Sequence, residues 1–158
     1  MGPSIKTGYY AQEHETLALD NTLLETVRRA GNLSESNAVA FLLRYLFTYK
    51  QASEKICKLS GGERSRLQLA LLVLSGANFP LMDEPTNNLD IASAEVLESA
   101  LSDFVGTVLV ISHDRYFLDR TVERILALED GRVREYAGGY SNYVEQKVSR
   151  QNNPKTCD

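Results

Sequence analysis

The chain has 158 residues, a formal net charge of −4, a hydrophobic fraction of 43% and a charged fraction of 24%, as expected for one soluble globular domain. The acidic balance argues against a protein built mainly to coat nucleic acid, and two distant cysteines argue against a disulfide framework and favour a reducing, cytoplasmic setting. No stretch approaches the roughly 20 apolar residues of a membrane span, and the first residues lack the pattern of a signal peptide.

The front of the chain predicts one strand followed by a mainly helical region. Residues 5–10 have the composition of a short strand. Apolar residues at helical spacing predict a first helix over 22–29 and a second one ending near residue 47. The candidate capping residues of these two helices are Asp20, Asn21, Ser36 and Asn37. The polar segment 48–58 is expected to be a connector.

Strands and helices alternate in the rest of the chain. The predicted elements are a helix over 60–74, a strand over 78–82, a helix over 92–104, a strand over 108–111, a short helix over 114–120, two strands over 124–128 and 133–136, and a helix over 140–149. The strands over 78–82 and 108–111 are continuously apolar, which is typical of buried parallel strands. The turn Glu129-Asp130-Gly131-Arg132 predicts a β-hairpin. This alternation indicates an α/β layered sheet.

The motif Leu59-Ser60-Gly61-Gly62-Glu63 opens the longest predicted helix. A serine at a helix start offers a hydroxyl group beside backbone N–H groups that have no partner within the helix. Two glycines let an anion approach that backbone closely, and the helix dipole favours negative charge. The motif therefore indicates a phosphate contact, while an ordinary capped turn is the alternative for Ser-Gly-Gly alone.

Asp83 and Glu84 follow the apolar segment 78–82. The carboxyl ends of parallel strands line the crevice where α/β sheets bind ligands. One carboxylate there could hold Mg²⁺, which takes few protein oxygens. The next could orient or deprotonate an attacking water molecule. A solvated acidic strand end is the alternative for this pair alone.

Two further polar residues follow predicted strands. His113 comes after the strand over 108–111 and could form a hydrogen bond with a terminal phosphate. Gln12 follows the first strand, and its amide oxygen could complete a Mg²⁺ or water shell. Neither residue indicates a function alone. The order of both residues along the chain, together with the motif 59–63 and the acidic pair, does indicate one.

In order and spacing, these motifs resemble those of the ATP-binding-cassette ATPases. Gln12 is similar to the Q-loop glutamine, 59–63 to the family signature, 79–84 to the Walker B strand, 87–90 to the D-loop, and His113 to the switch histidine. The strings that resemble the duplicated ABC-F subfamily are Asp83-Glu84-Pro85-Thr86-Asn87, Ile111-Ser112-His113-Asp114-Arg115-Tyr116-Phe117-Leu118 and Gly138-Gly139-Tyr140-Ser141-Asn142-Tyr143. The resemblance covers about residues 5–147.

The resemblance implies an α/β, P-loop NTPase-like ATP-binding-cassette domain with a helical subdomain. This partial nucleotide-binding domain would occupy residues 1–149, with the helical subdomain at about 13–58, the signature-to-switch core at 59–139 and a flexible tail at 150–158. In the family, two such domains close head to tail around two ATP molecules. The implied partner is therefore a second nucleotide-binding domain, in the same or another chain.

The resemblance also implies a role for each motif residue. The signature of one domain contacts the nucleotide held by the other, and Asp90 would lie at their interface. Glu84 would be the catalytic base, and His113 would contact the γ-phosphate. The implied nucleotide-contacting residues are Ser60, Gly61, Gly62, Glu63 and Asp90, and the implied Mg²⁺ ligands are Gln12 and Asp83.

Three features depart from the family pattern. The sequence contains no G-x-x-x-x-G-K-[ST] phosphate loop, so we expect a segment truncated at its N-terminus that binds Mg-ATP poorly alone. Pro80 removes a backbone donor from the Walker B strand, which predicts a bend, a late start or an altered sheet edge. Asn88 replaces the histidine usual in ABC-F proteins, and asparagine still offers hydrogen bonds.

Other functions are alternatives to the ATPase segment. ABC-F proteins often act at the ribosome, so one alternative is a translation factor in which ATP is the switch. The basic helix residues that could meet rRNA are Arg28, Arg29, Arg44 and Lys50, although solvated basic faces are more common. A transporter's ATPase subunit and an interaction module without activity are further alternatives, and a second copy of the segment is another candidate partner.

Overall fold

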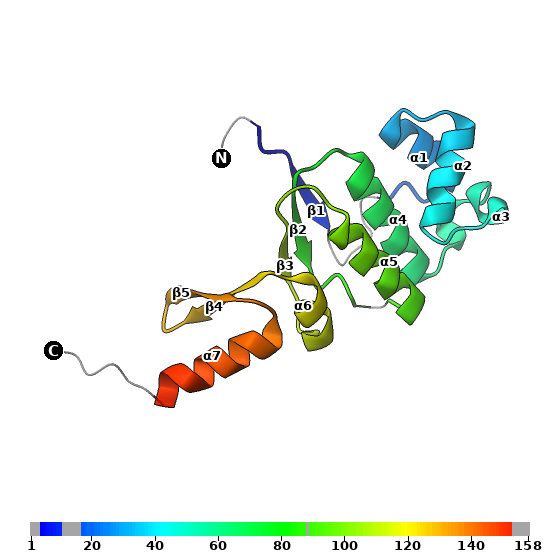
Figure 1. Ribbon diagram of the computed structural model, residues 1–158. Coiled ribbons are helices and arrows are strands. Elements are labelled where there is room, and N and C mark those ends of the chain that lie inside the picture. The colour runs from blue at the N-terminus through cyan, green and yellow to red at the C-terminus, as the bar shows by residue number, and fades with distance from the viewer. Residues whose placement is uncertain (1–3, 11–16, 88, 153–158) are drawn as a thin grey trace. The chain divides into compact units, whose positions relative to one another are not determined.

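The computed structural model describes residues 4–10, 17–87 and 89–152, with side chains described as far as residue 150 (Figure 1). Gln12 and Asn88 lie outside these ranges. The chain divides into two compact units, Met1–Ile111 and Ser112–Asp158. The predicted boundaries of the helical subdomain, the core and the tail stay predictions.

In the described part of the first unit, three parallel strands form a sheet in the order β1 (Thr7–Tyr10), β2 (Phe79–Asp83) and β3 (Leu109–Ile111). Tyr10 and Met82 pair in register and are both buried. On that face the Tyr10 hydroxyl group lies 3.5 Å from the carbonyl oxygen of Ser65, in helix α4 (Gly61–Leu74). The parallel α/β sheet that the sequence predicts is therefore present, with α4 on one of its faces.

The other face of this sheet is largely exposed. Tyr9 is 67% exposed, and Leu109 and Ile111 are 44% and 60% exposed. The prediction that 108–111 is a buried strand is therefore wrong, although a strand is present. The reason is that β3 is an edge strand, and side chains that alternate along it reach a face that lacks a covering layer among the described residues.

Pro80 lies inside β2, where it is buried and pairs in register with Gly8 of β1. Phe79 donates its N–H to the Lys6 carbonyl on the β1 side at 3.1 Å, and the next position along the strand turns toward β3. Register pairs with β3 begin only at Leu81. Proline therefore occupies the position before β2 joins β3, and the predicted late start is wrong, because β2 already begins at Phe79.

The helices of the first unit pack around α4. They are α1 (Leu23–Gly31), α2 (Glu35–Arg44), the short α3 (Tyr49–Ala52), a 3-10 turn η1 (Ile56–Lys58), α4, and α5 (Ile91–Ser102). Helix α4 contacts α1, α5 and β1, so it joins the group of α1, α2 and α3 to the sheet (Figure 1). The large apolar side chains buried in this unit include Leu23, Val27, Leu42, Phe47, Ile56, Leu67 and Leu97.

Several helix starts differ from the predicted ones. The expected caps, Asp20 or Asn21 for α1 and Ser36 or Asn37 for α2, are wrong. Thr22 caps α1 in a reciprocal box with Glu25, in which the backbone N–H groups of both residues have acceptors, whereas a single cap satisfies one such group. Ser34 caps α2. The expected connector 48–58 is also wrong, because it contains α3 and η1.

The described part of the second unit consists of α6 (Arg115–Thr121), the antiparallel hairpin of β4 (Arg124–Glu129) and β5 (Arg132–Ala137), and α7 (Tyr140–Asn152). Asp130 and Gly131 connect the two strands with φ angles of 51° and 72°. Two successive residues with positive φ are typical of a type I′ turn, whose twist matches that of the flanking strands. The hairpin predicted from this turn is confirmed.

Helix α7 contacts α6 through the Gly-Gly-Tyr-Ser motif. Asp119 accepts hydrogen bonds from the Ser141 N–H and hydroxyl group, each at 2.7 Å. A Cβ atom on Gly139 would lie 2.7 Å from the Asp119 Cα atom, so only glycine fits this approach. The motif is therefore explained by packing within this unit. None of the helices in the described ranges has the length and apolar character that crossing a membrane requires.

Candidate functional site

The signature turn forms the N-terminus of α4. Ser60 is the N-cap residue, and its Oγ accepts a hydrogen bond from the Glu63 N–H at 3.3 Å. In return, Glu63 Oε2 accepts a hydrogen bond from the Ser60 N–H at 2.8 Å. This capping box confirms the predicted helix start. Ser60 and Gly61 are exposed, and a Cβ atom on Gly61 would meet no described atom within 4 Å.

The open surface beside this turn has the chemistry of an anion contact. The backbone N–H groups of Gly61 and Gly62 are among the four at a helix start that have no partner within the helix. Helix α4 has 14 residues, so its dipole places partial positive charge at the same end. The exposed Ser60 hydroxyl group adds a third donor. Helix geometry therefore directs several donors toward one accessible point.

The carboxylate of Glu63 is held in its charged form. Its hydrogen bond from Ser60 keeps the pKa of Glu63 below its usual range, with smaller contributions from Arg66 and Gln51. Gln51, on α3, donates from its Nε2 to Glu63 Oε1. Burial opposes this shift. Glu63 is therefore part of the scaffold of the turn as well as a neighbour of the predicted phosphate contact.

Asp90 caps α5. Its Oδ1 accepts a hydrogen bond from the Ser93 N–H at 2.8 Å. Hydrogen bonding with Ser93 lowers the pKa of Asp90, and the positive charge of Arg66 contributes in the same direction. Arg66 therefore favours the charged forms of both Glu63 and Asp90, one at the start of α4 and the other at the start of α5.

The acidic pair lies where β2 ends. Asp83 is exposed and pairs in register with Ile111. Glu84 leaves the strand with φ of 44°, in the left-handed region that is uncommon for any residue other than glycine. Its N–H donates to the Ile111 carbonyl oxygen at 2.8 Å, and its own carbonyl oxygen accepts from the Asn87 N–H at 3.1 Å. The two adjacent carboxylates therefore have different backbone settings, and Glu84 is the more buried of the two.

The acidic end of β2 has the chemistry expected for binding Mg²⁺. In the part of the chain that the structure describes, no three His, Cys, Asp or Glu side chains gather into a metal cage. Mg²⁺ needs no such cage, since it takes one or two carboxylates and fills its other positions with water and phosphate oxygens. The exposed carboxylate of Asp83 fits this requirement. Gln12, the other expected ligand, lies outside the described residues.

His113 belongs to the second unit, where its side chain is exposed. The next residue, Asp114, caps α6 and accepts a hydrogen bond from the Phe117 N–H at 3.0 Å. The Asp114 N–H in turn donates to Ser112 Oγ at 3.1 Å. His113 therefore sits on a hydrogen-bonded turn at a helix start. Its contact with a γ-phosphate stays a prediction.

Two features of the site were absent from the sequence-based interpretation. The first is Gln51, whose signal was the pattern Thr48-Tyr49-Lys50-Gln51, a capping box of the same S/T-x-x-E/Q form as the one at Ser60. The second is the left-handed backbone of Glu84. No local signal predicts that conformation, because glutamate favours right-handed backbone angles.

The parallel sheet, the capped signature helix and the acidic strand end define the fold of an ATP-binding-cassette ATPase domain. A dimeric ATP-binding cassette solved in a post-hydrolysis state with ADP and Pi is similar, with a TM-score of 0.66 and 28% identity over 84% of this chain and 63% of that chain. The family model described as "ABC transporter" matches residues 3–87, more than half of the chain. The chain therefore belongs to the ABC transporter family.

The curated relatives include members of the F group of this family. ABC transporter F family member 5 of Arabidopsis thaliana is 40% identical over 147 residues, which are 92% of this chain and 21% of that protein. The energy-dependent translational throttle protein EttA of Mycobacterium tuberculosis is 48% identical over 99 residues, 63% of this chain and 18% of that protein. The chain thus spans about a fifth of the length of each of these two relatives.

Proposed function

We propose that this chain supplies parts of two composite sites at which ATP is bound and hydrolysed, each completed by another nucleotide-binding domain. The observation that carries the proposal is the exposed, capped start of α4, where Ser60, Gly61 and Gly62 present donors to one point. Such a helix start binds phosphate oxygens. The donors would contact the γ-phosphate of an ATP molecule held by the partner domain, and Asp90 would lie at the interface.

The acidic strand end would act in the second composite site. Asp83, with Gln12, would hold Mg²⁺, which when bound neutralises phosphate charge and aligns the phosphate oxygens. Glu84 would orient the attacking water molecule and accept its proton, and His113 would contact the γ-phosphate. The position of Glu84 directly after the carboxyl end of β2 supports this assignment, because α/β sheets bind ligands at the carboxyl ends of their strands.

The partner would be a second nucleotide-binding domain. The similar solved cassette is dimeric, which supports a head-to-tail pair for this chain. We expect the 158-residue chain to associate with a complete cassette domain only when Mg-ATP is present, as measured by sedimentation velocity. Association that does not depend on ATP, or no association at all, would contradict the proposal.

Calorimetry tests what the chain does alone. These 158 residues contain no G-x-x-x-x-G-K-[ST] loop, whose backbone and lysine bind phosphates in P-loop proteins. We therefore expect only weak binding of Mg-ATP to the isolated chain. A sub-micromolar dissociation constant would show that another part of the chain binds nucleotide and would overturn this assignment of roles.

A second candidate function is translation control, with ATP as the switch. The relative named an energy-dependent translational throttle protein is 48% identical over its matched region, which supports this candidate. The basic residues Arg28, Arg29, Arg44 and Lys50 are exposed on α1, α2 and α3 and are the candidate rRNA contacts. Binding to ribosomes that weakens with salt, and weakens uniformly when these residues are replaced by alanine, would support it. Salt-independent pelleting would count against it.

A further inference from the structure

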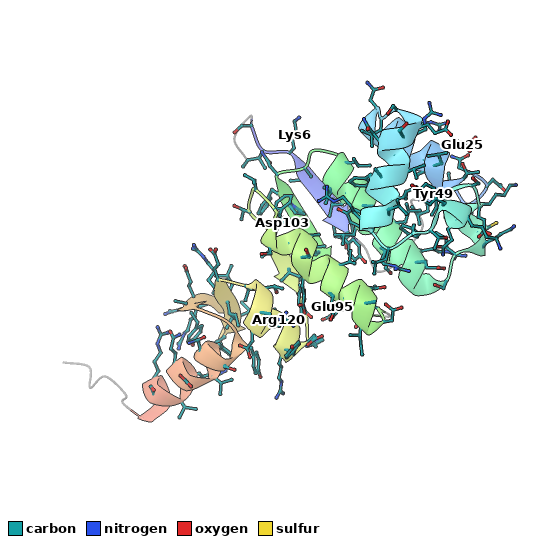
Figure 2. All side chains as sticks on the ribbon, turned by 45° about the vertical axis from the view of Figure 1, so that its right-hand side comes forward. Lys6, Glu25, Tyr49, Glu95, Asp103 and Arg120 are labelled. Atoms are coloured by element: carbon teal, nitrogen blue, oxygen red, sulfur yellow. The ribbon has the colours of Figure 1, made fainter. Side chains whose placement is uncertain are left out.

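In the first unit, the capping box of α3 is connected to the capping box of α4. In α3, Gln51 Oε1 accepts hydrogen bonds from the Thr48 N–H at 2.9 Å and the Thr48 hydroxyl group at 3.0 Å. The Gln51 N–H donates to Thr48 Oγ1 at 3.2 Å. The amide oxygen of Gln51 is thus used within its own helix. Figure 2 labels Tyr49, the first residue of this short helix.

The amide nitrogen of the same side chain is used elsewhere. Gln51 Nε2 donates to Glu63 Oε1, and the other carboxylate oxygen, Oε2, accepts the Ser60 N–H at 2.8 Å. One amide group therefore connects the cap of α3 to the cap of α4. Only a side chain with both an acceptor and a donor can do this, which singles out glutamine among the residues that complete a capping box.

This connection limits the freedom of Glu63. A glutamate has three rotatable side-chain bonds, and fixing them costs entropy. A contact at each carboxylate oxygen holds the side chain in the rotamer that accepts the Ser60 N–H. The backbone of Ser60 then keeps the extended conformation, with φ of −63° and ψ of 167°, in which Ser60 caps α4 and is exposed together with Gly61.

We propose that Gln51 is a positioning residue for the signature serine: by holding Glu63 from α3, it orients Ser60 and the donors of the first turn of α4 toward a phosphate group. The ligand in this statement rests on the proposed function, whereas the orientation of Ser60 does not. The rival explanation is that Gln51 only caps α3.

Two substitutions separate these explanations. Gln51→Glu keeps a carboxylate acceptor for Thr48, so the cap of α3 survives, but it removes the donor and places a second negative charge beside Glu63. Gln51→Met removes both functions without adding charge. Lys50→Met is the matched control, because it changes the net charge by the same amount as Gln51→Glu at the neighbouring exposed position of α3.

The first measurement is an NMR pH titration of the 158-residue chain, following the Glu63 side-chain carboxyl carbon and the Ser60 amide. In the wild type, Arg66 and the Ser60 N–H also favour the charged form of Glu63. We expect both Gln51 variants to raise the titration midpoint of Glu63 and to shift the Ser60 amide with it, Gln51→Glu the more strongly. Lys50→Met should leave both signals close to those of the wild type.

The second measurement titrates inorganic phosphate at neutral pH and follows the amides of residues 60–62. We expect Gln51→Met to raise the dissociation constant for phosphate about fivefold. This change corresponds to the net free energy of one hydrogen bond. If the Glu63 and Ser60 signals change in Gln51→Met but stay as in the wild type in Gln51→Glu, the only role of Gln51 is to cap α3. That result would overturn the proposal. If phosphate binds the wild type at these amides, equal binding by Gln51→Met would also overturn the proposal.

The same titrations keep the two proposals apart. If both variants move the Glu63 and Ser60 signals but phosphate leaves the wild-type amides of residues 60–62 unchanged, Gln51 positions Ser60 and the proposed phosphate contact fails. If phosphate binds at those amides while the variants leave Glu63 and Ser60 unmoved, the phosphate contact stands and the positioning role fails.

Discussion

The signature turn and the acidic strand end carry the two proposed halves of the chemistry, and they are built in different ways. At the signature turn, Ser60 and Glu63 satisfy each other's backbone N–H groups, three residues apart. At the strand end, Glu84 is held in a left-handed conformation, and its N–H donates to Ile111, on a strand far along the chain. One region is organised by its own sequence, the other by a distant strand.

The difference indicates where each region is vulnerable. A capping box survives as long as its helix exists, so the signature turn depends on α4 and on the residues that hold Glu63. A residue with positive φ costs energy unless its surroundings impose it, and such residues concentrate at functional sites. The strand end therefore depends on the pairing of β2 with β3. Substitutions at the two regions should consequently act on different properties.

The largest expected effect is on catalysis at the strand end. Glu84→Gln keeps the shape of the side chain but removes the proton acceptor, so ATP hydrolysis should fall at least about 100-fold when a phosphate loop is joined to the same domain as Glu84. A phosphate-release assay would measure this. Glu95→Gln, at an exposed carboxylate of α5 labelled in Figure 2, should change the rate little. Equal loss in both variants would remove Glu84 from the proposed role.

At the signature turn, the largest stability effect should come from the cap. Ser60→Ala removes the acceptor for the Glu63 N–H and should lower the free energy of unfolding by about 1 kcal/mol. Ser60→Asn restores an acceptor and should recover most of that loss. Urea unfolding followed by circular dichroism would give both values. An unchanged midpoint in Ser60→Ala would show that the cap contributes little to this unit.

Glycine should have opposite effects at the two regions. Gly61 needs neither positive φ nor a close approach, so Gly61→Ala should stabilise the chain by about 0.5 kcal/mol. At position 84, where φ is positive, Glu84→Gly should be more stable than Glu84→Ala by about 1 kcal/mol. Both comparisons use the same urea unfolding measurement. The same sign at both positions would contradict the contrast between a relaxed and an imposed backbone.

The smallest expected effect is the pH dependence of the signature cap. The pKa of Glu63 lies below its usual range in the folded chain, so the unfolded chain binds more protons between the two pKa values. The stabilising contribution of Glu63 is therefore complete above the usual carboxyl range and is lost as pH falls through the folded value. The difference in unfolding free energy between wild type and Glu63→Gln should shrink over that acidic range. A difference that does not vary with pH would argue against a hydrogen-bonded carboxylate.

Part of this molecule could be predicted from its sequence because the deciding interactions are local. The start of α4 at Ser60 depends on Glu63, three residues away, and the hairpin turn depends on the adjacent residues Asp130 and Gly131. The apolar segment before Asp83 predicted a parallel strand, and pairing with β1 and β3 confirms it. Capping and turn chemistry act over a few residues, so sequence patterns report them well.

Tertiary structure alone decided the remaining features. The exposure of Leu109 and Ile111 depends on which faces of the sheet are covered, and a run of apolar residues does not contain that information. The backbone of Glu84 depends on a hydrogen bond to β3, and the contact of Gln51 with Glu63 depends on how α3 packs beside α4. The sequence by itself determined the motifs, the class of fold and the capped signature turn. Long-range pairing decided the conformation of the proposed base and the support of the signature serine, because backbone strain and side-chain contacts between distant segments arise only when the chain has folded.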